Sequence, residues 1–410
     1  MRRTIALNVD PVIDFSALRQ YQRFMFRNVG DERRWVLGID ELSAIESPDL
    51  AKNKAIQEWV FGFLSYEMKN SLEGLHSRSK DELGYPTSYW FVPRFVFEMN
   101  DKGCVLHVHG SDESAGRELA NVLFRNDSEV QGGRVRKWIS RTPRTNYIDA
   151  VNALLKYIRR GDIYEVNYCT SRHAEVDADW DPFNAFIHLF SRTNAEHAGF
   201  LRIGERFALC ASPERFLAFK GDQVMAQPMK GTRARSGSAV EDERIAIELA
   251  KDPKERAENI MALDVMRNDL SRIAKRRSVI VDELCAVRPH GKVFQMTSTV
   301  RAELKEGITP YDAVLASFPM ASMTGAPKYR SMQLIDELED QCRGLFSGTM
   351  GFFAPDGTAD LNVVIRTLFF NAAQHMVTLV TGGALTANCD PEKEWDECEL
   401  KARSVLDALQ

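Results

Sequence analysis

Residues 212–233 read SPERFLAFKGDQVMAQPMKGTR, and this stretch predicts a β-hairpin. Its two apolar-rich runs, Phe216–Lys220 and Val224–Gln227, are separated by Gly221-Asp222. A Gly-Asp pair between two such runs is typical of a tight turn that joins antiparallel strands. The stretch therefore favours a fold built on antiparallel sheet.

Candidate site residues lie at both ends of this hairpin. Glu214 precedes its first strand and Lys230 follows its second strand, so we expect both side chains at the same end. Gly231 has no Cβ and lets the backbone approach a ligand. Glu258 follows on a predicted helix, for which Asp252 is a suitable N-cap. Taken alone, Lys230 and Glu258 are better explained as solvated surface residues than as functional ones.

A second acidic pair lies near the C-terminus. Asp390-Pro391 is a typical helix start, and an apolar stripe follows it at helical spacing: Trp395, Cys398, Ala402, Val405 and Leu409. Glu394 and Glu397 are three residues apart and share a face of this helix beside the stripe. The alternative is a solvated edge on which Glu397 and Lys401 form an i,i+4 ion pair.

The composition is that of a soluble globular protein. The chain has 410 residues, 44% hydrophobic and 27% charged, which is enough to bury a large core. A net charge of −5 argues against nucleic-acid binding. Seven scattered cysteines with no Cys-x-x-Cys pair predict free thiols and a cytoplasmic location. No apolar run reaches membrane-spanning length, and Met1–Thr4 is not followed by the apolar core of a signal peptide.

The pattern of elements predicts an α+β protein with large, mostly antiparallel sheets flanked by helices. Residues 1–140 are expected to be strand-rich, and residues 141–410 to form the catalytic region, the two being interleaved in one unit. The expected helices are 111–130, Thr145–Arg160, Pro182–Thr193, Lys328–Leu338 and those that begin at Pro253, Pro310 and Pro391. After the helix 182–193, strands are expected to resume at Phe207, and Leu345–Phe353, Leu361–Phe369 and Met376–Thr381 to form a meander.

Several segments resemble those of one enzyme family. These are PERF, PMKGTR, ERAENIMALDVMRNDLSRIA, SMTGAPKYRSMQLIDELE, VVIRTL and EWDECELKARSVL, in this order. They are similar to the chorismate-utilising enzymes, which comprise anthranilate synthase component I, aminodeoxychorismate synthase component I, and the isochorismate and salicylate synthases. The resemblance runs from about Thr145 to the C-terminus. It implies the α+β fold of that family.

The resemblance also implies roles for individual residues. Glu214 matches the general acid, and Glu258, Glu394 and Glu397 match the ligands of a Mg2+ ion. Mg2+ is a hard cation that binds carboxylates and leaves room for an anionic substrate. The substrate-binding positions are matched by Gly231, Thr232, Arg366, Gly382 and Gly383. Arg366 would pair with a carboxylate of chorismate, and Arg233 would help to lower the pKa of Lys230.

Lys230 favours one branch of the family. The anthranilate synthases have alanine at the matching position, whereas the aminodeoxychorismate synthases have a lysine that attacks ring carbon C2. We therefore expect amination of chorismate at C4 for p-aminobenzoate and folate synthesis. Ammonia would come from a separate glutaminase subunit, because no Gly-x-Cys-x-Gly motif is present. An anthranilate synthase component I and a non-catalytic chorismate-binding relative are the alternatives.

Several residues depart from the family's usual pattern. Glu165 stands where amine-using relatives usually have glutamine, and its segment, Tyr164-Glu165-Val166-Asn167, lacks the lysine that the water-using branch carries in a Tyr-x-Lys-Val motif. Gln295 replaces a histidine expected to face the substrate, and Ala384 replaces a glycine. The absence of the lysine argues against isochorismate or salicylate synthesis.

Overall fold

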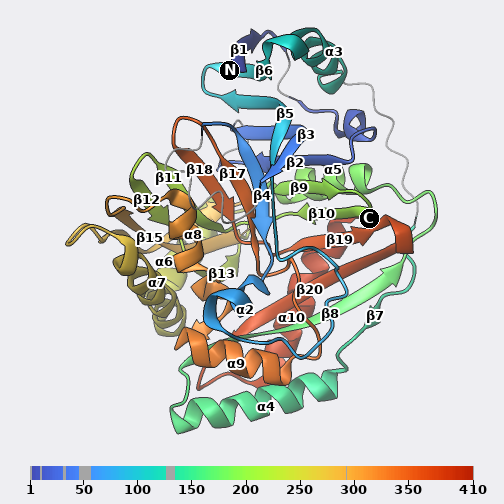
Figure 1. The fold of residues 1–410 in the computed structure, drawn as a ribbon. Helices are drawn as coiled ribbons and strands as arrows, with labels where there is room; N and C mark the ends of the chain where they lie inside the picture. The colour runs from blue at the N-terminus through green and yellow to red at the C-terminus, as the bar shows by residue number, and fades with distance from the viewer. Residues whose placement is uncertain are drawn as a thin grey trace.

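The protein is described by a computed structural model (Figure 1) that covers residues 2–9, 12–30, 34–45, 57–125, 134–291 and 293–409. Within these residues twenty strands form one continuous hydrogen-bonded network. Every pairing between named strands is antiparallel. Helices cover the strands from several sides, so the predicted α+β architecture is confirmed.

The bounds of the elements are as follows. The strands are β1 (Arg2–Leu7), β2 (Arg23–Asn28), β3 (Trp35–Ile45), β4 (Val60–Leu64), β5 (Ser88–Asn100), β6 (Gly103–His109), β7 (Ile139–Ser140), β8 (Glu165–Glu175), β9 (Gly199–Ile203), β10 (Arg206–Cys210), β11 (Arg215–Lys220), β12 (Gln223–Ala226), β13 (Met229–Ala234), β14 (Ile280–His290), β15 (Val293–Glu303), β16 (Gly325–Ala326), β17 (Thr349–Phe353), β18 (Thr358–Asn362), β19 (Thr367–Asn371) and β20 (Met376–Leu385). The α-helices are α2 (Met68–Glu73), α3 (Glu113–Leu123), α4 (Arg144–Arg160), α5 (Pro182–Thr193), α6 (Ala239–Lys251), α7 (Pro253–Ile273), α8 (Pro310–Ser317), α9 (Lys328–Leu338) and α10 (Pro391–Leu406).

The hairpin predicted in the opening stretch is present. β11 and β12 pair with Lys220 opposite Gln223, so Gly221 and Asp222 form the turn. Gly221 has a φ of 61°, a left-handed conformation that glycine adopts without strain. The predicted helix starts are also confirmed, because α5, α7, α8 and α10 each have a side-chain N-cap followed by proline: Asp181, Asp252, Thr309 and Asp390.

The predicted strand Leu361–Phe369 is wrong. The chain forms two strands instead, β18 and β19, which do not pair with each other. β18 pairs with β11 and β17, whereas β19 pairs with β10 and β20, so the expected meander is wrong as well. The break falls at residues 363–366, where Arg366 adopts a left-handed φ of 50°. The β-branched residues Val363 and Val364 are buried in the break, which explains why it resembles a strand.

Two other expectations need correction. Strands resume at Gly199 with β9, and not first at Phe207. The helix predicted over 111–130 is shorter, since α3 ends at Leu123; residues 126–133, with the predicted loop at Gln131-Gly132-Gly133, lie outside the described residues.

Strands from the first 140 residues are built into the rest of the sheet. β2 pairs with β9, and β4 lies between β5 and β17. Figure 1 shows β4 in the middle of the molecule, next to β17 and β18, while β1, β6 and α3 lie at one end. The two regions are therefore interleaved, although the boundary at residue 140 stays a prediction.

The helices that carry site residues pack on separate cores. α7 contributes Leu263, Met266 and Leu270 to the largest core. α10 meets α4 and β8 in a smaller core around Tyr147, whose hydroxyl lies 3.4 Å from Cys398 Sγ. The seven cysteines are all free thiols. Both helices are held against the sheet and present their acidic residues from fixed positions.

Candidate active site

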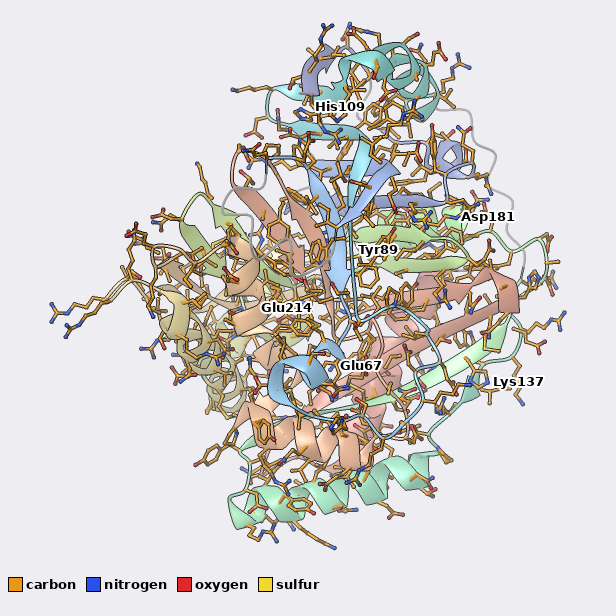
Figure 2. All side chains as sticks on the ribbon, in the orientation of Figure 1. Glu67, Tyr89, His109, Lys137, Asp181 and Glu214 are labelled. Carbon is orange, nitrogen blue, oxygen red and sulfur yellow. The ribbon has the colours of Figure 1, made fainter. Side chains whose placement is uncertain are left out.

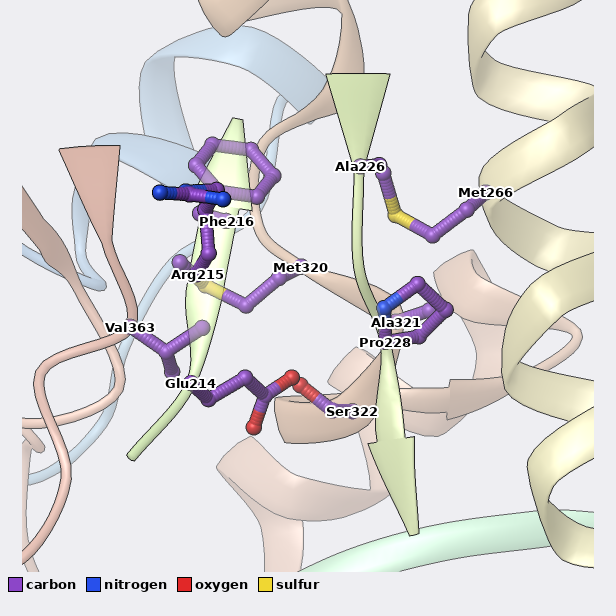
Figure 3. A pocket seen from close by; sticks show the side chains of 10 residues that line it. All are labelled: Glu214, Arg215, Phe216, Ala226, Pro228, Met266, Met320, Ala321, Ser322 and Val363. Carbon is purple, nitrogen blue, oxygen red and sulfur yellow. The ribbon is translucent and has the colours of Figure 1, made fainter. Parts of the chain in front are cut away.

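Glu214 lies in the interior, immediately before β11 (Figure 2). Its backbone N–H donates to Ser212 Oγ (3.2 Å), and its carbonyl accepts from Val363 N–H (3.0 Å). The side chain is only 5% exposed and points toward Ser322 in a small pocket with mostly apolar walls (Figure 3). Burial raises the pKa of the Glu214 carboxyl to about 7, although Ser322, Lys230 and Arg366 oppose this shift. Glu214 can therefore hold a proton near neutral pH.

Lys230 lies on β13 and forms a buried ion pair. Its Nζ atom is 2.9 Å from Glu165 Oε1, and the two side chains are 10% and 5% exposed. Burial lowers the pKa of Lys230, but the negative charges of Glu165, Glu258 and Glu214 outweigh this, and the net pKa is raised. The predicted fall of this pKa toward neutrality is thus wrong. Arg233, expected to assist it, pairs with Asp252 and Glu255 instead.

A short strand pairing fixes the position of Glu165. Glu165 stands at the start of β8 and pairs with Ala326 of β16. Ser331 Oγ donates to the Glu165 carbonyl at 3.1 Å. A Cβ on Gly325 would lie 2.1 Å from the same carbonyl oxygen, so only glycine permits this approach. The segment Thr324-Gly325-Ala326-Pro327 thereby holds the Glu165 carboxylate against Lys230.

Three carboxylates come from two helices. Glu258 on α7 is 8% exposed, and its Oε1 atom is buried without a hydrogen-bond partner, with Lys254 Nζ at 3.7 Å. Burial raises the pKa of Glu258 to about 7. On α10, burial and the neighbouring Glu397 raise the pKa of Glu394. Lys401 lies 2.8 Å from the half-exposed Glu397 and lowers the pKa of that carboxyl.

The donor set suits Mg2+, but the carboxylates do not form a closed cage. Among the described residues, no three acidic, histidine or cysteine side chains lie close enough to hold a metal ion as placed. The positive charge of Lys254 acts on Glu258, Glu394 and Glu397. The unpartnered oxygen of Glu258 is the observation that fits a cation, because a buried carboxylate oxygen without a donor is costly.

The predicted substrate-binding residues differ in their surroundings. A Cβ on Gly383 would lie 3.2 Å from Glu394 Oε2, so this glycine of β20 borders the acidic group. On Gly382 it would meet Cys169 Sγ at 2.5 Å. Arg366 is half-buried, and its guanidinium makes no hydrogen bond or ion pair with the residues that the structure describes. Thr232 lies on β13 and is exposed. Its side chain therefore lies outside the group of buried site residues.

Lys230 is the basic residue that interacts with all four glutamates predicted for the site. Its positive charge acts on Glu214, Glu258, Glu394 and Glu397, which come from three separate segments. Two further residues were not predicted from the sequence: Ser322, which faces Glu214, and Lys254, which faces Glu258. The i,i+4 spacing of Lys254 and Glu258 was a signal for the second contact. Nothing in the local sequence indicates the first.

A second cavity of about 460 Å³ lies beside this group. Its wall includes Pro213 and Met229, the residues that precede Glu214 and Lys230. His197 and His290 also line it.

The chain belongs to the chorismate binding enzyme family, whose model matches residues 12–407. It is 36% identical to "Anthranilate synthase component 1" of Thermus thermophilus over 361 residues, which are 86% of this chain and 77% of that protein. It is 40% identical to the chloroplastic "Aminodeoxychorismate synthase" of Arabidopsis thaliana over 269 residues, 65% of this chain and 29% of that protein. "Aminodeoxychorismate synthase component 1" of Escherichia coli is 36% identical over 67% of this chain and 59% of its own length.

Solved structures share the fold. Anthranilate synthase component I from Streptococcus pneumoniae has a TM-score of 0.77 at 23% identity, covering 98% of this chain and 92% of that chain. The isochorismate synthase MenF of Escherichia coli has a TM-score of 0.81 at 17% identity, covering 100% and 95%. The described helices include none that is long and apolar enough to span a membrane.

Proposed function

We propose that this chain replaces the C4 hydroxyl of chorismate with an amino group, the activity of aminodeoxychorismate synthase component I. The observation that carries the proposal is a buried lysine, Lys230, in one site with a carboxyl group, Glu214, that is protonated near neutral pH. A nucleophile and an acid are what a displacement of hydroxide requires. Several similar relatives carry this name as well.

The first displacement forms a covalent adduct. The Nζ lone pair of Lys230 attacks C2, both conjugated ring double bonds shift by one position, to C1=C6 and C4=C5, and the C4–O bond breaks. Hydroxide is a poor leaving group, so Glu214 donates its proton and water departs. The apolar walls around Glu214 support this role, because they keep the carboxyl protonated until the leaving oxygen needs the proton.

The second displacement releases the product. Ammonia attacks C4, both ring double bonds shift back, and the bond from C2 to Lys230 breaks. The product is 4-amino-4-deoxychorismate, a precursor for p-aminobenzoate and folate synthesis. A glutaminase partner would supply the ammonia, and a cytoplasmic location is part of the same proposal.

Positioning falls to residues around this pair. The Arg366 guanidinium makes no hydrogen bond or ion pair with the described residues, although its charge acts on Glu214, and it can bind a chorismate carboxylate through two parallel hydrogen bonds. Gly231, Gly382 and Gly383 would contact the substrate through their backbones, because a Cβ on each would meet protein atoms, those of Glu255, Cys169 and Glu394. Glu258, Glu394 and Glu397 would hold Mg2+, which when bound neutralises the ring carboxylate and draws electron density from the ring.

The alternative product is anthranilate, and the match to the Thermus thermophilus protein favours it, because that match covers 86% of this chain. The two activities differ in the ring carbon that receives nitrogen. Purified protein is incubated with chorismate, Mg2+ and ammonium at alkaline pH, and the products are separated by chromatography. We expect 4-amino-4-deoxychorismate and no fluorescent anthranilate; anthranilate as the main product would overturn the proposal.

The covalent role of Lys230 has its own test. With chorismate and Mg2+ but no ammonia, mass spectrometry should find an adduct on Lys230 with the mass of chorismate less one water. Lys230→Met removes the nucleophile at similar length and should abolish both adduct and amination. Lys230→Ala opens space near C2 and should give a trace of anthranilate. Wild-type amination by both variants would refute the covalent role.

A further inference from the structure

The contact between Glu165 and Lys230 opposes the proposed reaction, because it favours the protonated form of the lysine. The role assigned to Glu165 in this subsection rests on that reaction. An ammonium group has no free electron pair, so Lys230 must lose a proton before it attacks. The contact at 2.9 Å favours the ammonium form. Both side chains are buried, so little water competes with this contact.

Glu165 is a poor choice as the acceptor of that proton. A carboxylate is a far weaker base than an amine, by about six pKa units between ordinary glutamate and lysine. Proton transfer within the ion pair is therefore strongly uphill, and at neutral pH loss of the proton to solvent yields more free amine. The first displacement gains nothing from Glu165, which points to a role in the second.

In the covalent adduct the same nitrogen must be protonated, whereas it had to be deprotonated before the attack. After attack, Nζ carries two hydrogens, a positive charge and the bond to C2. From this protonated state it leaves C2 as a neutral amine, which is a good leaving group. If it first loses a proton, it must leave as an amide anion, and the displacement stops.

We propose that Glu165 is a catalytic residue of the second displacement: its carboxylate accepts a hydrogen bond from the adduct nitrogen, keeps that nitrogen protonated and so allows Lys230 to leave. Ammonia attacks C4, both ring double bonds shift back, and the C2–N bonding pair returns to Nζ, which leaves as a neutral amine. The new C4 ammonium gives its extra proton to the Glu214 carboxylate. Lys230 regains a proton from solvent, and the net reaction is chorismate plus ammonia to 4-amino-4-deoxychorismate plus water.

The charged groups around Nζ support this assignment. Glu165 on β8 is the ion-pair partner of Lys230 among the described residues. Glu214, Glu258, Glu394 and Glu397 also act on Lys230 or are acted on by it, but none forms an ion pair with it. Glu214 holds the proton for the leaving water, and the other three carboxylates belong to the proposed Mg2+ site.

The two displacements predict opposite effects of Glu165→Gln. Glutamine keeps the length of the side chain, and the backbone contacts to Ala326 and Ser331 do not depend on the carboxylate. Without the negative charge, Lys230 loses its proton more readily, so the adduct should form at least tenfold faster at neutral pH. Its removal by ammonia should be at least tenfold slower, so the adduct accumulates during turnover.

The experiment measures the two steps separately. Chorismate and Mg2+ are mixed with enzyme without ammonia, and the Lys230 adduct is followed by quenched-flow mass spectrometry from neutral to alkaline pH. Ammonium is then added and the decay of the adduct is followed. Asp162→Asn is the matched control, since Asp162 precedes the same strand, pairs with the exposed Arg160 and should leave both rates unchanged.

The outcomes separate this inference from the proposed function. An adduct that accumulates in Glu165→Gln under ammonium, but not in wild type, supports the role of Glu165. Equal decay rates in both proteins, with a normal adduct in wild type, overturn the role of Glu165 and leave the proposed function intact. A wild-type protein that forms no adduct at any pH overturns the proposed function, and the inference with it.

Discussion

At the residue scale, Glu214 and Glu258 combine deep burial with a pKa near neutrality. Both are less than 9% exposed, and burial raises each pKa to about 7 from an ordinary 4.5. A carboxyl group in this state is suited to proton donation. Once it ionises, the buried charge lowers the free energy of unfolding. Stability and activity at this site therefore respond to pH in linked ways.

Glu214→Gln should stabilise the protein in alkaline solution. Between pH 4.5 and about 7 the unfolded chain releases the Glu214 proton while the folded protein keeps it, so the free energy of unfolding falls as pH rises. A shift of this size corresponds to about 3 kcal/mol. Glutamine does not titrate in this range. The free energy of unfolding of the variant, relative to that of wild type, should therefore be higher at pH 8 than at pH 4 by about this amount. Urea unfolding at both pH values measures it.

Glu397→Gln is the control with the opposite sign. Lys401 lowers the pKa of Glu397, so the wild-type carboxylate is favoured above its ordinary pKa. This variant should lose stability slightly at the alkaline pH, because the ion pair is half-exposed. A pH-independent difference for Glu214→Gln would contradict the buried, protonated acid.

Individual site residues could be predicted from the sequence more easily than their contacts. The five acidic and basic residues proposed for chemistry were found from motifs, and the structure gathers them around Lys230. The ion pair between Lys230 and Glu165 was not predictable, because the residues are 65 positions apart and lie on β13 and β8, which pair with other strands and not with each other. The direction of the Lys230 pKa was missed for the same reason.

At the element scale, the helices were predicted well because their ends carry local signals. α5 and α9 match the predicted ranges residue for residue. The strands β18 and β19 were merged, because the residues that join them, Val363 to Arg366, are as apolar and β-branched as a strand. Only tertiary structure shows that this segment carries the chain between two parts of the sheet and turns at Arg366.

Two neighbouring glycines of β20 should respond differently to alanine. In Gly382→Ala the new Cβ would lie 2.5 Å from Cys169 Sγ and 2.7 Å from the Tyr168 carbonyl, so β8 and β20 must separate. Overpacking of this kind costs roughly 1–3 kcal/mol. In Gly383→Ala the contact is Glu394 Oε2 at 3.2 Å, which a side chain can relieve. We expect a lower Tm for Gly382→Ala, and for Gly383→Ala a near-normal Tm with weaker activity. Equal melting temperatures would contradict this.

The helices α7 and α10 should be linked by Mg2+. A cation that binds the folded protein alone raises its Tm, and here it would also neutralise the buried Glu258 and Glu394. We expect Mg2+ to raise the Tm of wild type at alkaline pH, and Glu258→Gln or Glu394→Gln to abolish that rise. Lys254→Met removes a competing positive charge and should strengthen Mg2+ binding. Full activity in excess chelator would contradict the metal site.

At the scale of the whole molecule, the order of the chain differs from the order of the sheet. The first 140 residues supply β2, which pairs with β9, and β4, which pairs with β17. They also supply Phe15 and Phe24, whose rings contact Phe200. The length of the chain allowed one large domain or two interleaved ones, and we expected one interleaved unit. The sequence does not show which strands join the two regions, because antiparallel partners far apart in sequence leave no local signal.

This arrangement predicts that residues 141–410 do not fold alone, although they contain every proposed site residue. Without the first region, β9 and β17 each lose a strand partner and expose unpaired backbone groups, and Phe200 loses part of its apolar cover. We expect this fragment to aggregate or to unfold without a cooperative transition, as measured by circular dichroism during urea titration. Addition of a separately produced fragment 1–140 should restore the transition and the binding of chorismate. A cooperative transition of 141–410 alone would show that the strand pairing between the two regions is dispensable.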